Sequence, residues 1–150
     1  MANITAAAVN ELRKRTGVGM MDCKKALVEC DGDMDKAIDY LREKGQKLAA
    51  KRADRDASEG AVLATVNADK TFAAVIMMNC ETDFVAKNED FVAFTREVLQ
   101  TAVDAKAKSL EEVMALTING LSVETMIVEQ VAKIGEKIES IGIKPAGLAP

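Results

Sequence analysis

The sequence predicts an α+β protein in which a three-helix bundle precedes an antiparallel hairpin or sheet packed with helices. Residues 1–45 contain three short segments with helical periodicity, separated by glycine-containing turns. From residue 59 the pattern becomes extended, with apolar runs at Ala61–Val66 and Thr71–Met78 on either side of a short polar loop. Helical periodicity returns after residue 88. Because an isolated hairpin is only marginally stable, we expect it to pack on those helices.

We expect four parts along the chain: a three-helix module at residues 1–45, a charged linker at 46–58, an α+β core subdomain at 59–143 and an irregular tail at 144–150. Thr5 is a good N-cap for the first helix, and Gly17 is expected to end it. Asp33 is expected to cap the third helix, which we expect to stop at Gly45. The second helix is expected to bury one face, made up of Met20, Cys23, Ala26, Leu27 and Cys30.

In the core subdomain, Phe72–Met78 is an apolar run typical of a strand buried on both faces. Asn88 can cap a long helix whose inward stripe comprises Phe91, Phe94, Val98 and Ala102. Further on, Ser109 opens a capping box, Asn119-Gly120 turns the chain, and Ser122 starts a helix that ends at Gly135. We expect residues 137–143 to add a third strand.

Composition argues for a binding protein rather than an enzyme. The 150 residues carry a net charge of −4 and include no histidine, which removes the commonest general base and zinc ligand. The acidic balance argues against broad binding to nucleic acid, and the basic strip in the linker has no interleaved aromatic residues to stack on bases. No apolar run is long enough to span a membrane, and from the first residues we expect no secretory signal. Three cysteines cannot all pair within one chain. Together with the expected lack of a secretory signal, this number favours free thiols in the reducing cytoplasm.

No catalytic, cofactor or metal constellation stands out. Gly17-Val18-Gly19 follows a helix rather than a strand and lacks the lysine of a phosphate loop, so we interpret it as a helix–helix turn. Cys23 and Cys30 share a helical face, which suits core packing better than zinc. Cys80 stays open as a reactive thiol, although no basic neighbour is evident.

The strand-to-helix corner Asn79–Lys87 is the candidate site, because it places Phe84 in a tight turn. The chain has only four phenylalanines, one tyrosine and no tryptophan. The residues alone leave two alternatives for Phe84: its ring can fold inward as core, or it can point outward as an anchor for a partner.

Two blocks of the sequence resemble signatures of the bacterial translation elongation factor Ts family: Arg15–Leu27 (Arg-Thr-Gly-Val-Gly-Met-Met-Asp-Cys-Lys-Lys-Ala-Leu) and Cys80–Lys87 (Cys-Glu-Thr-Asp-Phe-Val-Ala-Lys). Lys133-Ile134-Gly135-Glu136 is similar to a third, weaker block. The resemblance covers roughly residues 3–139. It implies an N-terminal module like ubiquitin-associated domains, joined to a core of antiparallel strands and helices.

The resemblance also implies a function: guanine-nucleotide exchange on elongation factor Tu, the GTPase that delivers aminoacyl-tRNA. Phe84 would wedge between helices of the GTPase domain near its magnesium and phosphate site, with Asp83 making a polar contact beside it. Thr82 and Val85 belong to the same corner. Ile134 and Gly135 match positions that touch the partner, and Lys24 and Arg13 match the contact surface of the N-terminal module. For Lys24 a solvated helix face, and for Ile134 core packing, stay open as alternatives.

Family members usually continue with a second core subdomain, so the resemblance implies that this chain binds more weakly and exchanges more slowly than longer members. Two other functions stay open. One is a non-catalytic adaptor, built on the module like ubiquitin-associated domains, that recognises a different protein. The other is a thiol enzyme based on Cys80.

Overall fold

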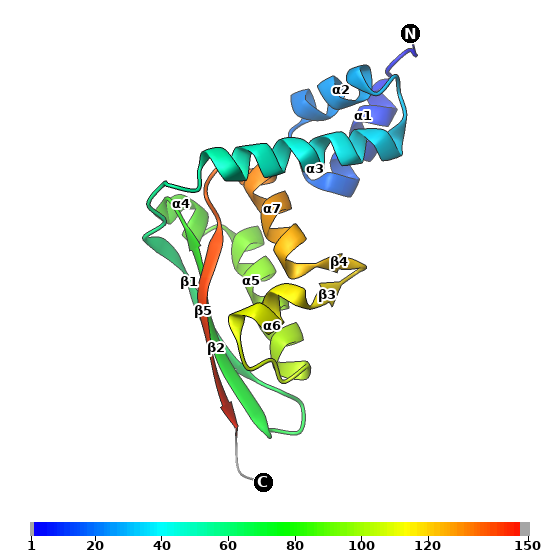
Figure 1. The fold of residues 1–150 in the computed structure, drawn as a ribbon. Helices are drawn as coiled ribbons and strands as arrows, with labels where there is room; N and C mark the ends of the chain where they lie inside the picture. Colours follow the sequence, from blue (N-terminus) through cyan, green and yellow to red (C-terminus); the bar gives the residue numbers. More distant parts are fainter. Residues whose placement is uncertain (1, 148–150) are drawn as a thin grey trace. The chain divides into compact units, whose positions relative to one another are not determined.

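The computed structural model describes residues 2–147, which form α-helices and antiparallel β-strands (Figure 1). The helices are α1 (Ala6–Thr16), α2 (Met20–Glu29), α3 (Met34–Lys51), α4 (Asp83–Ala86), α5 (Glu89–Asp104), α6 (Leu110–Ala115) and α7 (Val123–Ile134). The strands are β1 (Glu59–Val66), β2 (Phe72–Cys80), β3 (Thr117–Ile118), β4 (Leu121–Ser122) and β5 (Glu139–Gly147). The α+β class predicted from the sequence is confirmed. Within residues 2–147, no helix has the length and apolar character needed to cross a membrane.

The chain divides into two compact units. The first contains the chain up to Asp54 together with Val128–Gly135. The second contains Arg55–Ile127 and the chain from Glu136 onward. Compact units in one structure do not show which parts of the chain fold independently. The domain boundaries expected from the sequence therefore stay a prediction.

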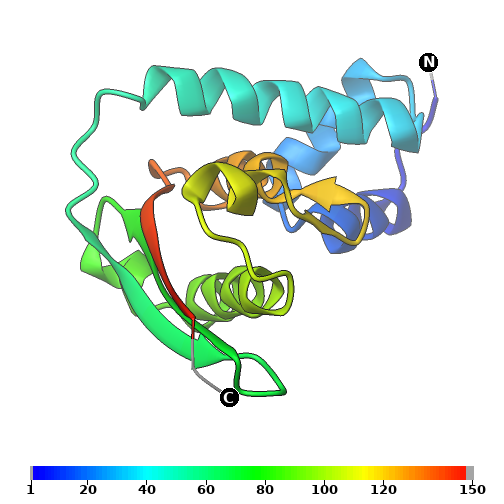
Figure 2. The same cartoon turned by 60° about the horizontal axis from the view of Figure 1, so that its bottom comes forward.

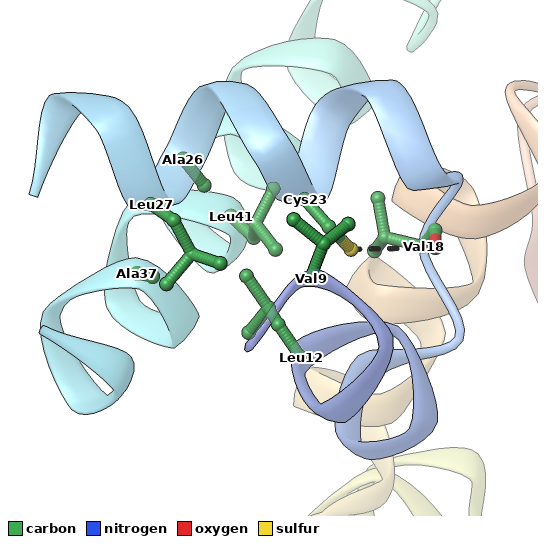
Figure 3. Packing of buried hydrophobic residues seen from close by; sticks show 8 residues of the cluster. All are labelled: Val9, Leu12, Val18, Cys23, Ala26, Leu27, Ala37 and Leu41. Carbon is green, nitrogen blue, oxygen red and sulfur yellow. Dashed lines mark hydrogen bonds between the residues drawn. The ribbon is translucent and has the colours of Figure 1, made fainter. Parts of the chain in front are cut away.

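In the first unit, α1, α2 and α3 enclose one apolar core (Figure 3). The buried side chains are Val9, Leu12, Val18, Cys23, Ala26, Leu27, Ala37 and Leu41. Thr5 caps α1 by accepting from the Ala8 amide, and Gly17 ends it with φ 70° in the left-handed region. The Cys23 thiol donates to the Val18 carbonyl at 3.5 Å, so this cysteine is part of the core (Figure 3). The three-helix bundle is therefore confirmed.

The prediction that the third helix stops at Gly45 is wrong. Helix α3 runs through Gly45, which is buried, and ends at Lys51, so the first residues of the expected linker are helical. A Cβ atom at Gly45 would lie 2.9 Å from Ala132 Cβ and 3.3 Å from the Val128 carbonyl oxygen. The glycine thus serves the close approach of α7 to α3 rather than helix termination. Arg42 Nε binds Glu129 Oε1 at 2.9 Å across the same pair of helices.

The second unit is built on a three-stranded antiparallel sheet in the order β1-β2-β5. Figure 2 shows α5 lying along one face of this sheet. The predicted hairpin is confirmed, and Asn67 Oδ1 closes its loop by accepting from the Thr71 and Phe72 amides, each at 3.0 Å. The third strand is present but is shifted toward the C-terminus, at Glu139–Gly147. Residues 144–147 of the expected irregular tail therefore belong to a strand, and 148–150 lie outside the described residues.

Strand β2 buries one face, not both as the sequence predicted. Ile76 and Met78 point toward the core and are fully buried, whereas Val75 on the opposite face is 42% exposed. Val62, which pairs diagonally across from Val75 on β1, is also exposed. Successive side chains along a strand point to opposite faces of the sheet. Because α5 packs against only one of these faces, the side chains on the other face stay exposed. The predicted stripe of α5 is confirmed, since Phe91, Phe94, Val98 and Ala102 are all buried.

The capping and turn signals of the C-terminal half are also confirmed. Ser109 Oγ accepts from the Glu112 amide at 3.1 Å, and Ser122 Oγ accepts from the Thr125 amide at 3.1 Å. Asn119 and Gly120 have φ values of 53° and 82° between the two short strands β3 and β4. Both residues are thus in the left-handed region, as the tight turn of a two-residue hairpin requires.

Because β2 is buried on one face only, Ile76→Ala and Val75→Ala should differ strongly in stability. We expect Ile76→Ala to lower the free energy of unfolding by about 2–5 kcal/mol, since it leaves a cavity in a packed core. Val75→Ala should lower it by about 1 kcal/mol or less, the range of a partly exposed strand position. Urea denaturation followed by circular dichroism measures both. Equal losses would contradict the one-sided sheet.

Gly45→Ala should destabilise the protein although alanine is the better helix former. In an unobstructed helix interior, glycine lowers the free energy of unfolding by about 0.5–1 kcal/mol relative to alanine. Here the added methyl meets Ala132 and the Val128 carbonyl, so we expect a net loss of about 1–3 kcal/mol from overpacking. Adding Ala132→Gly should restore part of that loss, and thermal unfolding of the single and double variants tests it. A stabilised Gly45→Ala variant would show that α7 does not pack closely there.

Candidate functional site

The strand-to-helix corner is a single helical turn that presents Phe84 to solvent. Strand β2 ends at Cys80, and Thr82 becomes the N-cap of α4, with its hydroxyl oxygen accepting from the Val85 amide at 3.5 Å. Phe84 is 84% exposed, the largest exposed fraction among the large hydrophobic side chains described as exposed. This excludes the alternative in which its ring folds into the core. An exposed phenylalanine on an ordered turn is a suitable anchor for a partner pocket.

The other residues of this corner are oriented differently. Asp83 is exposed and its Oδ2 lies 3.5 Å from Lys87 Nζ, an i,i+4 ion pair that contributes little stability at such exposure. Val85 is half-buried, and α4 contacts strands β1 and β2. Val85 therefore helps seat the turn, while Phe84 and Asp83 stay available. The structure thus brings Thr82, Asp83, Phe84 and Val85 together.

Two glutamates bind this corner to the segment that follows α7. Glu136 Oε1 accepts from the Glu81 amide at 3.1 Å and from the Thr82 amide at 3.0 Å. Glu136 Oε2 accepts from the Thr82 hydroxyl at 2.7 Å. In return, Glu81 Oε1 accepts from the Lys137 amide at 2.7 Å. Each acidic side chain therefore satisfies backbone donors on the other segment. Sequence reasoning missed both glutamates as site residues, although each lies within a block singled out above.

The N-terminal module has its own exposed surface. Lys24 lies in a groove lined by Ile4, Ala6, Val9, Asn10, Met20, Met21 and Lys24 itself. Met21 is 78% exposed, and Met20, which the sequence placed on the buried face of its helix, is 49% exposed. Met20 is the first residue of α2, and the buried residues of that helix begin only at Cys23. Arg13 is also exposed, in the last turn of α1.

Ile134 and Gly135 end α7 in the first unit. Gly135 has φ 80°, and its amide donates to the Val131 carbonyl at 2.8 Å, so it ends the helix as predicted. Both residues are half-buried. A half-buried Ile134 is compatible with both core packing and partner contact. Its role therefore stays a prediction.

Cys80 lacks the environment of a nucleophile. Its thiol is buried and donates to the Thr82 carbonyl at 3.2 Å. Burial, reinforced by the Glu136 carboxylate, raises the pKa of Cys80 to about 11. The reactive species is the thiolate, so a raised pKa opposes the thiol-enzyme alternative. Across residues 2–147, no group of three or more histidine, cysteine, aspartate or glutamate side chains is arranged to hold a metal ion.

Cys80 should therefore react slowly with iodoacetamide near neutral pH. At pH 8 a thiol of pKa about 11 has roughly 200-fold less thiolate than a free thiol of pKa about 8.5. We expect alkylation more than about 100-fold slower than that of glutathione, with a rate that rises about tenfold per pH unit between pH 8 and 10. Peptide mass spectrometry separates Cys80 from Cys23 and Cys30. A rate that levels off near pH 8 would contradict the raised pKa.

Comparison with known proteins links both candidate surfaces to one family. The family model described as "Elongation factor Ts, mitochondrial, N-terminal" matches residues 1–49, which contain the Lys24 groove. The model described as "Elongation factor TS" matches residues 81–144, which contain the Phe84 corner and Glu136.

Curated relatives extend the similarity across the chain. The chain is 58% identical over 139 residues to elongation factor Ts of Christiangramia forsetii, covering 93% of the chain and 50% of that protein. It is 55% identical over 144 residues to elongation factor Ts of Flavobacterium johnsoniae, covering 96% of the chain and 44% of that protein. The similarity to elongation factor Ts of Rhodopirellula baltica is 55% over 139 residues, 93% of the chain and 42% of that protein. The chain thus spans half or less of the length of these relatives.

Proposed function

The chain belongs to the elongation factor Ts family, and on that premise we propose that it promotes GDP release from elongation factor Tu as a guanine-nucleotide exchange factor. The observation that carries the proposal is Phe84, an 84% exposed aromatic ring on an ordered turn inside the matched region 81–144. In the resemblance described above, this ring wedges into the GTPase domain near its magnesium and phosphate site. The adaptor alternative is not favoured, because both matched regions belong to the same family.

The physical basis of exchange is thermodynamic linkage. A factor that binds the nucleotide-free GTPase more tightly than the GDP-bound form must weaken GDP binding by the same ratio. Coupling energies of this kind are typically about 1–3 kcal/mol, or about 5- to 150-fold in affinity. Exchange on this basis involves no bond making or breaking by the factor itself. The proposed role is therefore one of protein–protein contact rather than chemical catalysis, exerted in the cytoplasm where translation takes place.

The proposed contacts differ in character. Phe84 supplies the apolar wedge and Asp83 a polar contact beside it, while Thr82 and Val85 hold the turn to the protein. Lys24 and Arg13 provide positive charge on the exposed surface of the N-terminal module. Ile134 and Gly135 complete the proposed set at the end of α7. Direct binding to nucleic acid or to a membrane is not part of the proposal.

Replacing Phe84 with alanine should largely abolish the acceleration of GDP release. Truncation of a central aromatic anchor lowers binding by about 2 kcal/mol or more, so we expect kcat/KM for exchange to fall at least about 30-fold. Stopped-flow release of fluorescent GDP from elongation factor Tu measures this. Because the ring is exposed, the variant should keep its melting temperature. If the chain accelerates release and Phe84→Ala does so equally well, the wedge is not Phe84.

Lys24 and its neighbour Lys25 allow a matched test of the N-terminal surface. Both side chains are exposed on α2, but only Lys24 lines the groove with Met20 and Met21. We expect Lys24→Ala to raise the concentration needed for half-maximal exchange about three- to tenfold, the effect of losing a charge at the rim of an interface. Lys25→Ala should change it less than twofold. Equal effects of the two variants would indicate general electrostatic attraction instead of a contact at Lys24.

A further inference from the structure

Phe84 lies on a helix that is too short to be stable on its own. Helix α4 has four residues, and its turn is closed by hydrogen bonds such as the one from the Lys87 amide to the Asp83 carbonyl at 3.0 Å. A single turn is unstable in isolation, because fixing its backbone angles is offset by very few hydrogen bonds. The exposed ring adds almost no burial to compensate. The direction in which Phe84 points must therefore be fixed by contacts outside α4.

Glu136 supplies such contacts at the start of the turn. Its carboxylate accepts from the amides of Glu81 and Thr82 and from the Thr82 hydroxyl, at 3.1, 3.0 and 2.7 Å. Hydrogen bonds to an ionised carboxylate are about twice as strong as those between neutral groups. Glu136 is also held in place, because the amide of the next residue, Lys137, donates to Glu81 Oε1 at 2.7 Å. The two segments thus fix each other reciprocally.

The Thr82 hydroxyl connects the Glu136 carboxylate to the first turn of α4. A hydroxyl has one proton, and a carboxylate can only accept, so the proton of Thr82 points to Glu136 Oε2. The lone pairs of the same oxygen are then directed to the Val85 amide, 3.5 Å away, which makes Thr82 the N-cap of α4. Glu136 therefore sets the orientation of the cap one residue before Asp83 and two before Phe84.

From this arrangement we propose that Glu136 is a positioning residue, which holds the Thr82 cap so that Phe84 is presented to elongation factor Tu already in its binding geometry. The inference rests on the proposed exchange function. Its physical basis is preorganisation: a contact residue ordered before association loses less conformational entropy on binding. Without the carboxylate, two backbone amides and one hydroxyl lose their acceptor, and the turn is free to take other conformations.

A double-mutant cycle between Glu136→Ala and Phe84→Ala tests the proposal by stopped-flow GDP release from elongation factor Tu. If Glu136 acts through Phe84, Glu136→Ala should lower kcat/KM for exchange roughly tenfold in the wild-type chain and less than twofold in the Phe84→Ala chain. Glu136→Gln, which keeps one acceptor oxygen, should recover part of the activity. Glu139→Ala is the matched control, since that carboxylate lies 3.5 Å from Lys137 Nζ and not at the Thr82 cap. An equal fall in both backgrounds, or none in either, overturns the proposal.

A second pair of variants guards against loss of folding in Glu136→Ala. Thr82→Val removes the hydroxyl between Glu136 and Val85, and Thr82→Ser retains it. Exchange should be lowered clearly more by Thr82→Val than by Thr82→Ser, because only serine keeps the hydroxyl. If both variants exchange like the wild-type chain, the cap does not position Phe84, and the proposal is overturned.

Hydrogen exchange of the backbone amides separates failure of the inference from failure of the proposed function. If the wild-type chain does not accelerate GDP release, the proposed function fails. The positioning claim is then judged by the Thr82 and Val85 amides, which should exchange at least about tenfold faster in Glu136→Ala, with amides of α1 unchanged as an internal control. Unchanged protection of Thr82 and Val85 overturns the positioning role as well.

Discussion

The reciprocal pairing of Glu81 and Glu136 is the interaction on which the candidate site depends. It joins the end of β2 to the segment that leads into β5, so the Phe84 turn is fixed to the sheet from outside its own four residues. An exposed aromatic ring contributes little to stability, and its conformation must be maintained by neighbouring polar contacts. The Glu136 carboxylate does this because three donors converge on it, while the Glu81 carboxylate accepts from the Lys137 amide.

The sheet beneath the turn provides the rigid support. Strand β2 is central, pairs with β1 and β5, and is covered on one face by α5, whose aromatic residues Phe91 and Phe94 are buried. Phe84 and Phe91 are separated by a short stretch of chain but differ in burial, because Phe84 is exposed and Phe91 is buried. The Asn88 cap, which accepts from the Asp90 and Phe91 amides, ends the exposed turn and starts the buried helix. This division lets the corner expose one ring without weakening the core that holds it.

Much of the fold was predictable because local signals fixed it. Helix ends are marked by side-chain hydrogen bonds or by a left-handed backbone conformation, and both depend on neighbouring residues alone. The residues that mark them are Thr5, Gly17, Asp33, Asn88, Ser109 and Ser122. The errors lay where distant segments decide. Gly45 fits the signal of a helix end, yet α3 continues because α7 packs against it. Strand β2 fits the signal of two-sided burial, yet Val75 is exposed because α5 covers one face.

The sequence by itself determined the α+β class, the three-helix module, the hairpin and the resemblance on which the proposed exchange function rests. It also marked the Asn79–Lys87 corner, but left Phe84 undecided between core and surface. Only the tertiary structure decided that point, because it leaves Phe84 84% exposed on α4 while Val85 is half-buried. It also brought Glu136 to Thr82 from a distant part of the chain. Periodicity describes the faces of one element, whereas a hydrogen bond between remote segments depends on the folded path of the whole chain.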